Sequence, residues 1–153
     1  MILPTDFACR QSPTRLSAGY REERGLIVNI FIVEDSETVR GHLQSMMSDI
    51  PGVAVVGCAG DEKGAIKRIR ESLPDVVTLD LNLHPGSGIA VLEYIKQNHA
   101  GIKVIVLTNH VDDFYIDRCR HSGADHVFDK TLQFSRVNSV LWSWLNADCK
   151  SVH

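Results

Sequence analysis

Residues Val76 to Leu83 read VVTLDLNL, a short run of branched apolar residues that ends in an aspartate. Other short runs rich in valine and isoleucine occur on either side of it along the chain. Runs of this kind are typical of strands that are covered on both faces. In chain order the predicted strands are Ile27–Val33 (IVNIFIV), Val53–Cys58 (VAVVGC), Val76–Leu79 (VVTL), Lys103–Leu107 (KVIVL) and Asp125–Phe128 (DHVF).

A segment with helical spacing follows each run. Its apolar residues recur three or four positions apart, which predicts one buried stripe per helix. Ser36, Asp61 and Ser87 are predicted to cap the first three helices. The stripes are Val39, Leu43, Met46 or Met47 and Ile50; Ile66, Ile69 and Leu73; Ile89, Leu92 and Ile95; Val111, Phe114 or Tyr115 and Cys119; and Phe134, Val137, Leu141 and Trp144.

The alternation of strands and helices predicts an α/β fold. Right-handed crossovers and the need to cover both faces of a parallel sheet favour a doubly wound arrangement. We therefore expect a flavodoxin-like, five-stranded parallel sheet of order 2-1-3-4-5 with five helices.

Length and composition support one globular domain. The chain has 153 residues, of which 44% are hydrophobic and 23% are charged. Residues 1–25 mix proline, serine, threonine and arginine, and we expect them to be a poorly ordered or short-helical extension, or the product of a start codon assigned too far upstream. The remainder divides into a folded domain at residues 26–149 and a tail at residues 150–153.

The charge pattern restricts the partners that the chain could have. The net charge of −3 gives no basic excess for binding phosphate backbones, so no direct nucleic acid partner is expected. No apolar run approaches the roughly 20 residues of a membrane span, and no secretion signal is present, which predicts no membrane insertion and a cytoplasmic location. The four scattered cysteines lack metal-ligand spacing, and we expect them to be reduced thiols.

Polar residues follow the predicted strands at their carboxyl ends. Glu34 and Asp35 follow the first strand, Asp80 the third, Thr108 the fourth, and Lys130 comes just after the fifth. In a doubly wound sheet these ends meet at the topological switch point. Converging carboxylates repel one another unless a cation lies among them, and oxygen ligands suit Mg²⁺.

This set of residues is also suited to phosphoryl chemistry. Asp80 would be the nucleophile that forms an acyl phosphate, while Asp35 and Glu34 would hold Mg²⁺ directly or through water. Thr108 and Lys130 would each contact a phosphoryl oxygen. No organic cofactor is expected, because acids stand where a phosphate-binding loop would need glycine or threonine.

Several of these stretches together resemble the receiver domain of two-component response regulators. The resemblance extends from roughly Ile27 to Asp148. It rests on VEDSE at Val33–Glu37, VVTLDLNL at Val76–Leu83, VLTN at Val106–Asn109 and DK at Asp129–Lys130.

The resemblance implies a role for each site residue. Asp80 would take a phosphoryl group from a histidine of a sensor kinase or phosphotransfer protein. The metal would be bound by Glu34, Asp35, Asp80 and the backbone carbonyl of Asn82. Thr108 and Val127 match the positions that switch conformation.

The chain departs from the common receiver pattern at four positions. Thr131 follows Lys130 where proline is frequent, so no cis peptide bond is expected there. Val127 replaces an aromatic residue and has Phe128 as its neighbour on the other face of the strand. Asn109 replaces a small residue, and Pro85 lies one position later in its loop than usual.

The expected function is that of a stand-alone response regulator, a signalling phosphoacceptor and not an enzyme acting on other molecules. The last helix is expected to end near Asp148 and the chain stops at His153, which leaves no room for an output domain. Output would then pass through a downstream protein target. A truncated receiver of a longer DNA-binding regulator would have the same sequence. A phosphorylation-independent interaction module is the other alternative, whereas a haloacid-dehalogenase-like phosphohydrolase needs a second acid where Asn82 stands.

Apolar surface residues predict a contact face. Trp142 and Trp144 are two apart on a helix, so only one can face the core. With Phe114, Tyr115 and Val127, the exposed tryptophan would form a homodimer or partner surface on the fourth helix, fifth strand and fifth helix. The histidines share no ligand spacing, but His84 and His110 are expected beside the acidic pocket.

Overall fold

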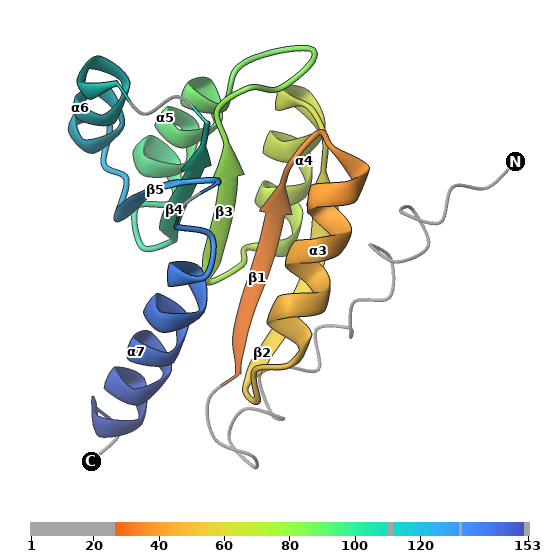
Figure 1. Ribbon diagram of the computed structural model, residues 1–153. Helices are drawn as coiled ribbons and strands as arrows, with labels where there is room; N and C mark the ends of the chain where they lie inside the picture. Colours follow the sequence, from red (N-terminus) through yellow and green to blue (C-terminus); the bar gives the residue numbers. More distant parts are fainter. Residues whose placement is uncertain (1–26, 110–111, 132, 152–153) are drawn as a thin grey trace, which may run out of the picture.

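A computed structural model describes residues 27–109, 112–131 and 133–151, with side chains to residue 145 (Figure 1). The predicted extension at residues 1–25 lies outside the described residues, as do His110 and Val111. Within the described part, five parallel strands form one sheet of order β2-β1-β3-β4-β5. The predicted doubly wound sheet is therefore confirmed.

Strands and helices alternate along the described chain, as the sequence predicts. The strands are β1 (Val28–Val33), β2 (Val53–Ala59), β3 (Val76–Asp80), β4 (Lys103–Thr108) and β5 (His126–Asp129). The helices are α3 (Glu37–Ser48), α4 (Glu62–Ser72), α5 (Gly88–Asn98), α6 (Asp113–His121) and α7 (Arg136–Ser151).

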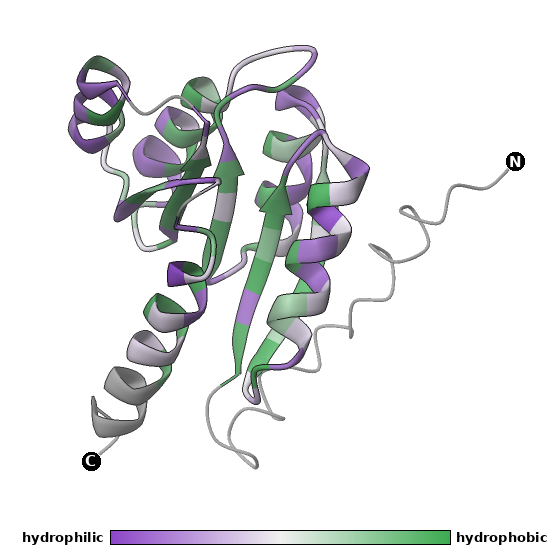
Figure 2. Cartoon of the chain, viewed as in Figure 1, coloured by the Kyte–Doolittle hydropathy of each residue, from purple (hydrophilic) through white to green (hydrophobic). Residues whose placement is uncertain are grey.

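Helices cover both faces of the sheet and create two hydrophobic layers. One layer packs α4, α5 and Cys119 of α6 against residues such as Val77 and Leu79 of β3. The other layer packs α3 and α7 against residues such as Ile30 and Ile32 of β1. Figure 2 shows β1 and β3 as almost continuously apolar, the pattern of strands buried on both faces. This burial fixes the positions of the strand ends.

The predicted caps are confirmed at three helices. The Ser36 hydroxyl accepts a hydrogen bond from the amide of Val39 at the start of α3. Asp61 accepts from Gly64 at the start of α4, and the Ser87 hydroxyl accepts from Ile89 at the start of α5. Each cap satisfies an amide that the first helical turn leaves without a partner.

Two parts of the predicted buried stripes are wrong. Leu73 has a φ of 46° and a side chain that is 53% exposed, because the chain turns into the left-handed region as α4 ends. Phe114 and Tyr115 are also exposed. Among the described side chains of α6, Cys119 alone is buried, so this helix packs on the sheet along a narrow stripe.

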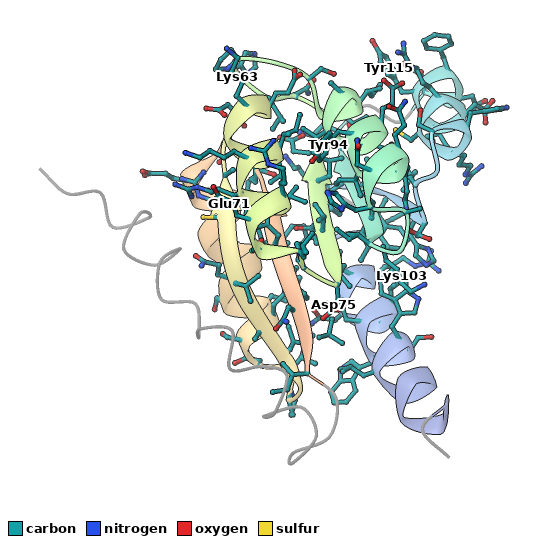
Figure 3. The ribbon with its side chains drawn as sticks, turned by 180° about the vertical axis from the view of Figure 1, so that it is seen from behind. Lys63, Glu71, Asp75, Tyr94, Lys103 and Tyr115 are labelled. Atoms are coloured by element: carbon teal, nitrogen blue, oxygen red, sulfur yellow. The ribbon has the colours of Figure 1, made fainter. Side chains whose placement is uncertain are left out.

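The predicted division between the two tryptophans is confirmed, but the predicted aromatic face is divided. Trp142 is 46% exposed, whereas Trp144 packs against the core. Val127 is partly buried and packs against the layer that contains α4 and α5. Figures 1 and 3 place α6, which carries Tyr115, and α7 toward opposite ends of the molecule. The exposed aromatic residues therefore form two separate groups.

Two further findings concern cysteines and membranes. Cys58 is disulfide-bonded, so the expectation of reduced thiols is wrong for this residue. Cys119 is free and buried. In the described part of the chain, no helix has both the length and the apolar character needed to cross a membrane.

Candidate functional site

The sheet brings the predicted site residues to one edge. Val33 of β1 is paired with Leu79 of β3, so the next residues, Glu34 and Asp80, lie side by side. Asp80 is in turn paired with Leu107 of β4, which places Thr108 next to it along that strand. The acids therefore meet at the switch point between β1 and β3, as predicted.

Three carboxylates converge at this point. Glu34, Asp35 and Asp80 each offer an oxygen, and these atoms lie within 4.8 Å of one another. Glu34 and Asp80 are buried, whereas Asp35 lies at the surface. The cluster is therefore open to solvent on the side of Asp35.

Lys130 reaches into the same cluster from the end of β5. Its Nζ lies 2.9 Å from Oε1 of Glu34 and 3.1 Å from Oδ2 of Asp80. The backbone amide of Lys130 donates to the carbonyl oxygen of Thr108 at 2.9 Å, which joins the ends of β4 and β5. Thr108 itself is 1% exposed. The carboxyl ends of β1, β3, β4 and β5 thus supply the predicted side chains to one pocket.

The charges in the pocket are only partly balanced. Burial raises the pKa of the Glu34 carboxyl from its ordinary 4.5 to about 7, and the charge of Asp80 adds to the rise while Lys130 opposes it. Burial lowers the pKa of Lys130, but the hydrogen bond to Glu34 and the charge of Asp80 outweigh it and raise that pKa overall. An added cation would relieve the repulsion between the carboxylates.

The donor set fits a hard divalent cation. Carboxylate and carbonyl oxygens are the ligands that Mg²⁺ prefers, and Mg²⁺ usually takes only one or two protein carboxylates directly. Asn82, whose carbonyl is the fourth predicted ligand, lies close by because its amide donates to Oδ1 of Asp80 at 3.1 Å. The crowded carboxylates and the raised pKa of Glu34 both agree with a cation site.

Hydrogen bonds from neighbouring residues orient the acids. The Ser36 amide donates to Oε2 of Glu34 at 3.2 Å, and Nη1 of Arg40 donates to the Glu34 carbonyl at 2.7 Å. Nδ1 of His84 lies 3.1 Å from Oδ2 of Asp35. His84 thus lies beside the acidic pocket, as predicted.

The departures from the receiver pattern have structural consequences. Among the described residues the cis peptide bond is at His84–Pro85, and the bond after Lys130 is trans, as expected. The Thr131 hydroxyl donates to Oδ1 of Asn109 at 3.4 Å, so two of the unusual residues contact each other. Val127 and Phe128 belong to opposite hydrophobic layers, which confirms their predicted orientation.

One contact near the site was missed by the sequence analysis. Oε1 of Glu62, in the first turn of α4, accepts a hydrogen bond from the Ser87 amide at 2.9 Å. The only sequence signal was an acid directly after the Asp61 cap, and this is common at helix starts. The contact links α4 to the loop between β3 and α5.

Comparison with known proteins agrees with this geometry. A family model of the response regulator receiver domain matches residues 30–141, which is more than half of the chain. The chain belongs to the response regulator receiver domain family. Its acidic pocket is of the kind at which receiver domains bind Mg²⁺.

Two relatives illustrate the similarity of this receiver domain to curated proteins. It is 31% identical over 114 residues to the response regulator protein VraR of Staphylococcus saprophyticus, covering 74% of this chain and 54% of VraR. It is 31% identical over 117 residues to the response regulator UvrY of Escherichia coli, covering 76% of this chain and 54% of UvrY. The receiver domain thus spans about half the length of these relatives.

Solved structures show the same fold. A LuxR-family two-component response regulator from Aurantimonas matches with a TM-score of 0.73 and 26% identity, over 79% of this chain and 86% of that chain. The response regulator domain of Thermotoga maritima CheB matches with a TM-score of 0.69 and 25% identity, over 80% and 96% of the two chains. The receiver fold is therefore supported by sequence and by structure.

Proposed function

We propose that this receiver domain accepts a phosphoryl group on Asp80 from a histidine of a sensor kinase or phosphotransfer protein, with Mg²⁺ as cofactor. The observation that carries the proposal is the contact of the Lys130 ammonium with buried Asp80, beside Glu34 and Asp35. A buried carboxylate with a fixed cation and further acids beside it is suited to attack on phosphorus.

The transfer is a displacement at phosphorus. A carboxylate oxygen of Asp80 forms a bond to phosphorus while the bond from phosphorus to the donor imidazole nitrogen breaks. The electron pair of the broken bond stays on that nitrogen, and a donor ring protonated at its other nitrogen leaves as neutral imidazole. The product is an acyl phosphate on Asp80.

Each site residue has a proposed role in this step. Lys130, 3.1 Å from Oδ2 of Asp80, would pair with a phosphoryl oxygen, and the Thr108 hydroxyl would donate to another. Glu34, Asp35, Asp80 and the Asn82 carbonyl would hold Mg²⁺. When bound, the cation would neutralise charge on the oxygens of the transferring group.

The proposed consequence of phosphorylation is a change in a protein-binding surface. Thr108 would move toward the phosphoryl group, and Val127 would fill less space than an aromatic residue at that position. The movement of Thr108 would shift the equilibrium between two conformations of the neighbouring loops. The exposed Phe114 and Tyr115 on α6 and Trp142 on α7 support contact with a downstream protein or a second copy. We propose that this signalling role is cytoplasmic, without direct nucleic acid contact or membrane insertion.

A second candidate is the receiver part of a longer DNA-binding regulator. The observation that favours it is the coverage of 54% of both VraR and UvrY. The phosphoacceptor chemistry is the same in both cases. They differ in what receives the signal, because the stand-alone protein would act through its own surface.

The test is intact mass spectrometry after incubation with Mg²⁺ and acetyl phosphate. We expect one phosphoryl adduct on the wild type, none on Asp80→Asn, and none when EDTA removes the cation. Asp117→Asn, which changes an exposed acid on α6, is the matched control and should be labelled normally. Absence of an adduct, together with absence of Mg²⁺ binding by calorimetry, would favour the phosphorylation-independent interaction module.

A further inference from the structure

The loop between β3 and α5 is fastened to the first turn of α4. The Ser87 amide donates to Oε1 of Glu62 at 2.9 Å, and the Glu62 amide donates to the Pro85 carbonyl at 3.2 Å. Figure 1 shows this loop and the start of α4 at the same end of the molecule. Glu62 therefore contacts the loop through both its side chain and its backbone.

Gly86 brings the loop directly against the Glu62 side chain. Its φ is +108°, a conformation that favours glycine. A Cβ at this position would overlap Cβ of Glu62 and would lie 2.7 Å from Oε1 of that residue. The loop thus packs on Glu62 at van der Waals distance, with no room for a side chain between them.

The other side of the same loop carries the phosphoacceptor. The Asn82 amide donates to Oδ1 of Asp80, and Asn82 pairs with Ser87 in an isolated antiparallel bridge. Leu81 and Leu83 are buried, so Asn82 is held between two anchored neighbours. A continuous series of contacts therefore runs from Glu62 through Ser87 and Asn82 to Asp80.

We propose that Glu62 is a positioning residue for the phosphoacceptor site. By holding Ser87 and Pro85 it fixes the loop, and so the Asn82 backbone, beside Asp80. This inference rests on the proposed function, because it assigns to Glu62 a part in metal binding and phosphoryl uptake. Residues that orient metal ligands without binding the metal commonly affect metal affinity by about 10- to 100-fold.

The experiment compares Glu62→Ala with Glu62→Gln in the full chain. Glutamine keeps an oxygen that can accept from Ser87, whereas alanine removes it. We expect Glu62→Ala to weaken Mg²⁺ binding about tenfold by calorimetry and to slow adduct formation from acetyl phosphate. Glu62→Gln should restore most of both, and hydrogen exchange at the Ser87 amide should rise in Glu62→Ala alone.

Two control variants separate this effect from charge and helix stability. Glu71→Ala removes the same charge at the other end of α4, where Figure 3 labels it away from Lys63 of the first turn. Asp61→Ala removes the α4 cap, which accepts from Gly64, and so weakens the helix while keeping the Glu62 carboxylate that accepts from Ser87. Both controls should keep the wild-type Mg²⁺ affinity, and urea midpoints will report their stability.

The outcomes distinguish the two proposals. A wild type that binds no Mg²⁺ and takes no phosphoryl group overturns the proposed function. If the wild type does both, two results overturn the role of Glu62. One is a Mg²⁺ affinity of Glu62→Ala equal to that of the wild type, and the other is an equal loss of Mg²⁺ affinity in Asp61→Ala. If Glu62→Ala does not fold, Gly86→Ala gives a second measurement. This substitution places a Cβ against Glu62 and should also weaken Mg²⁺ binding.

Discussion

Nζ of Lys130 lies 3.1 Å from Oδ2 of Asp80, with the two side chains only 13% and 4% exposed. The same ammonium lies 2.9 Å from Oε1 of Glu34. One cation therefore compensates two buried carboxylates. Breaking a buried ion pair by removing one partner leaves an uncompensated charge, which is strongly unfavourable.

The first prediction concerns this cation. Lys130→Met should lower the free energy of unfolding in EDTA at neutral pH by about 3 kcal/mol, because the buried carboxylate of Asp80 then loses the cation that compensates its charge. Urea unfolding followed by circular dichroism measures the change. Lys103→Met is the matched control, because Lys103 is exposed and its Nζ lies 5.2 Å from the centroid of the Trp144 ring. Removing this cation should lower the free energy of unfolding by less than about 1 kcal/mol. Equal losses in the two variants would contradict the prediction.

The second prediction is a pH dependence of stability in the absence of metal. The folded protein keeps the Glu34 proton up to about pH 7, whereas the unfolded chain releases it near 4.5. Between these values the folded state binds more protons, so the free energy of unfolding falls as pH rises. A shift of this size corresponds to roughly 3 kcal/mol for this group.

Glu34→Gln isolates that contribution. Glutamine keeps an acceptor for the Ser36 amide but has no charge to lose. Urea unfolding in EDTA at about pH 5 and about pH 7.5 should show a smaller decrease for the variant than for the wild type. Parallel decreases in the two proteins would show that Glu34 does not titrate in this range.

The convergence of Glu34, Asp80, Thr108 and Lys130 could be predicted from sequence because it follows from topology. Parallel strands that alternate with helices must place their carboxyl ends at one edge, whatever the details of the loops. Each of these residues directly follows or ends a strand that short apolar runs identify. The order of the strands and the three helix caps could be predicted for the same reason: they depend on local patterns and general rules of connection.

The contact of Glu62 with Ser87 could not be predicted in this way. It depends on the path of a loop whose Gly86 has a φ of +108°, and on the orientation of a helix from another unit. Leu73 shows a related difficulty, since its helical spacing is correct but the chain leaves the helix one residue earlier. Phe114 has helical spacing too, yet α6 buries only a narrow stripe around Cys119.

The third prediction concerns the free thiol of Cys119. Burial raises its pKa, so the reactive thiolate is scarce and the sulfur is shielded from solvent. In the native protein at about pH 8, iodoacetamide should label Cys119 at less than about a tenth of the rate seen in urea. Peptide mapping by mass spectrometry measures the two rates. Rapid labelling of Cys119 without denaturant would show that α6 opens readily from the sheet.

The last prediction compares two glycines that meet different surroundings. At Gly88, the start of α5, a Cβ would overlap the Asp80 carbonyl oxygen and lie 2.6 Å from Cα of Leu81. Both are backbone atoms at the end of the strand that carries Asp80, the proposed phosphoacceptor, so they cannot move aside as a flexible side chain would. Gly88→Ala should therefore destabilise the protein by more than about 2 kcal/mol and weaken Mg²⁺ binding, because α5 must shift away from β3.

Gly41, in the middle of α3, has no atom within 4 Å of an added Cβ. Gly41→Ala should instead stabilise the protein by about 0.5–1 kcal/mol, since alanine loses less conformational freedom in a helix than glycine does. Urea midpoints of the two variants should move in opposite directions from that of the wild type. A Gly88→Ala variant as stable as the wild type would mean that α5 does not pack on β3 as closely as described, and that the position of Asp80 is set by the sheet alone.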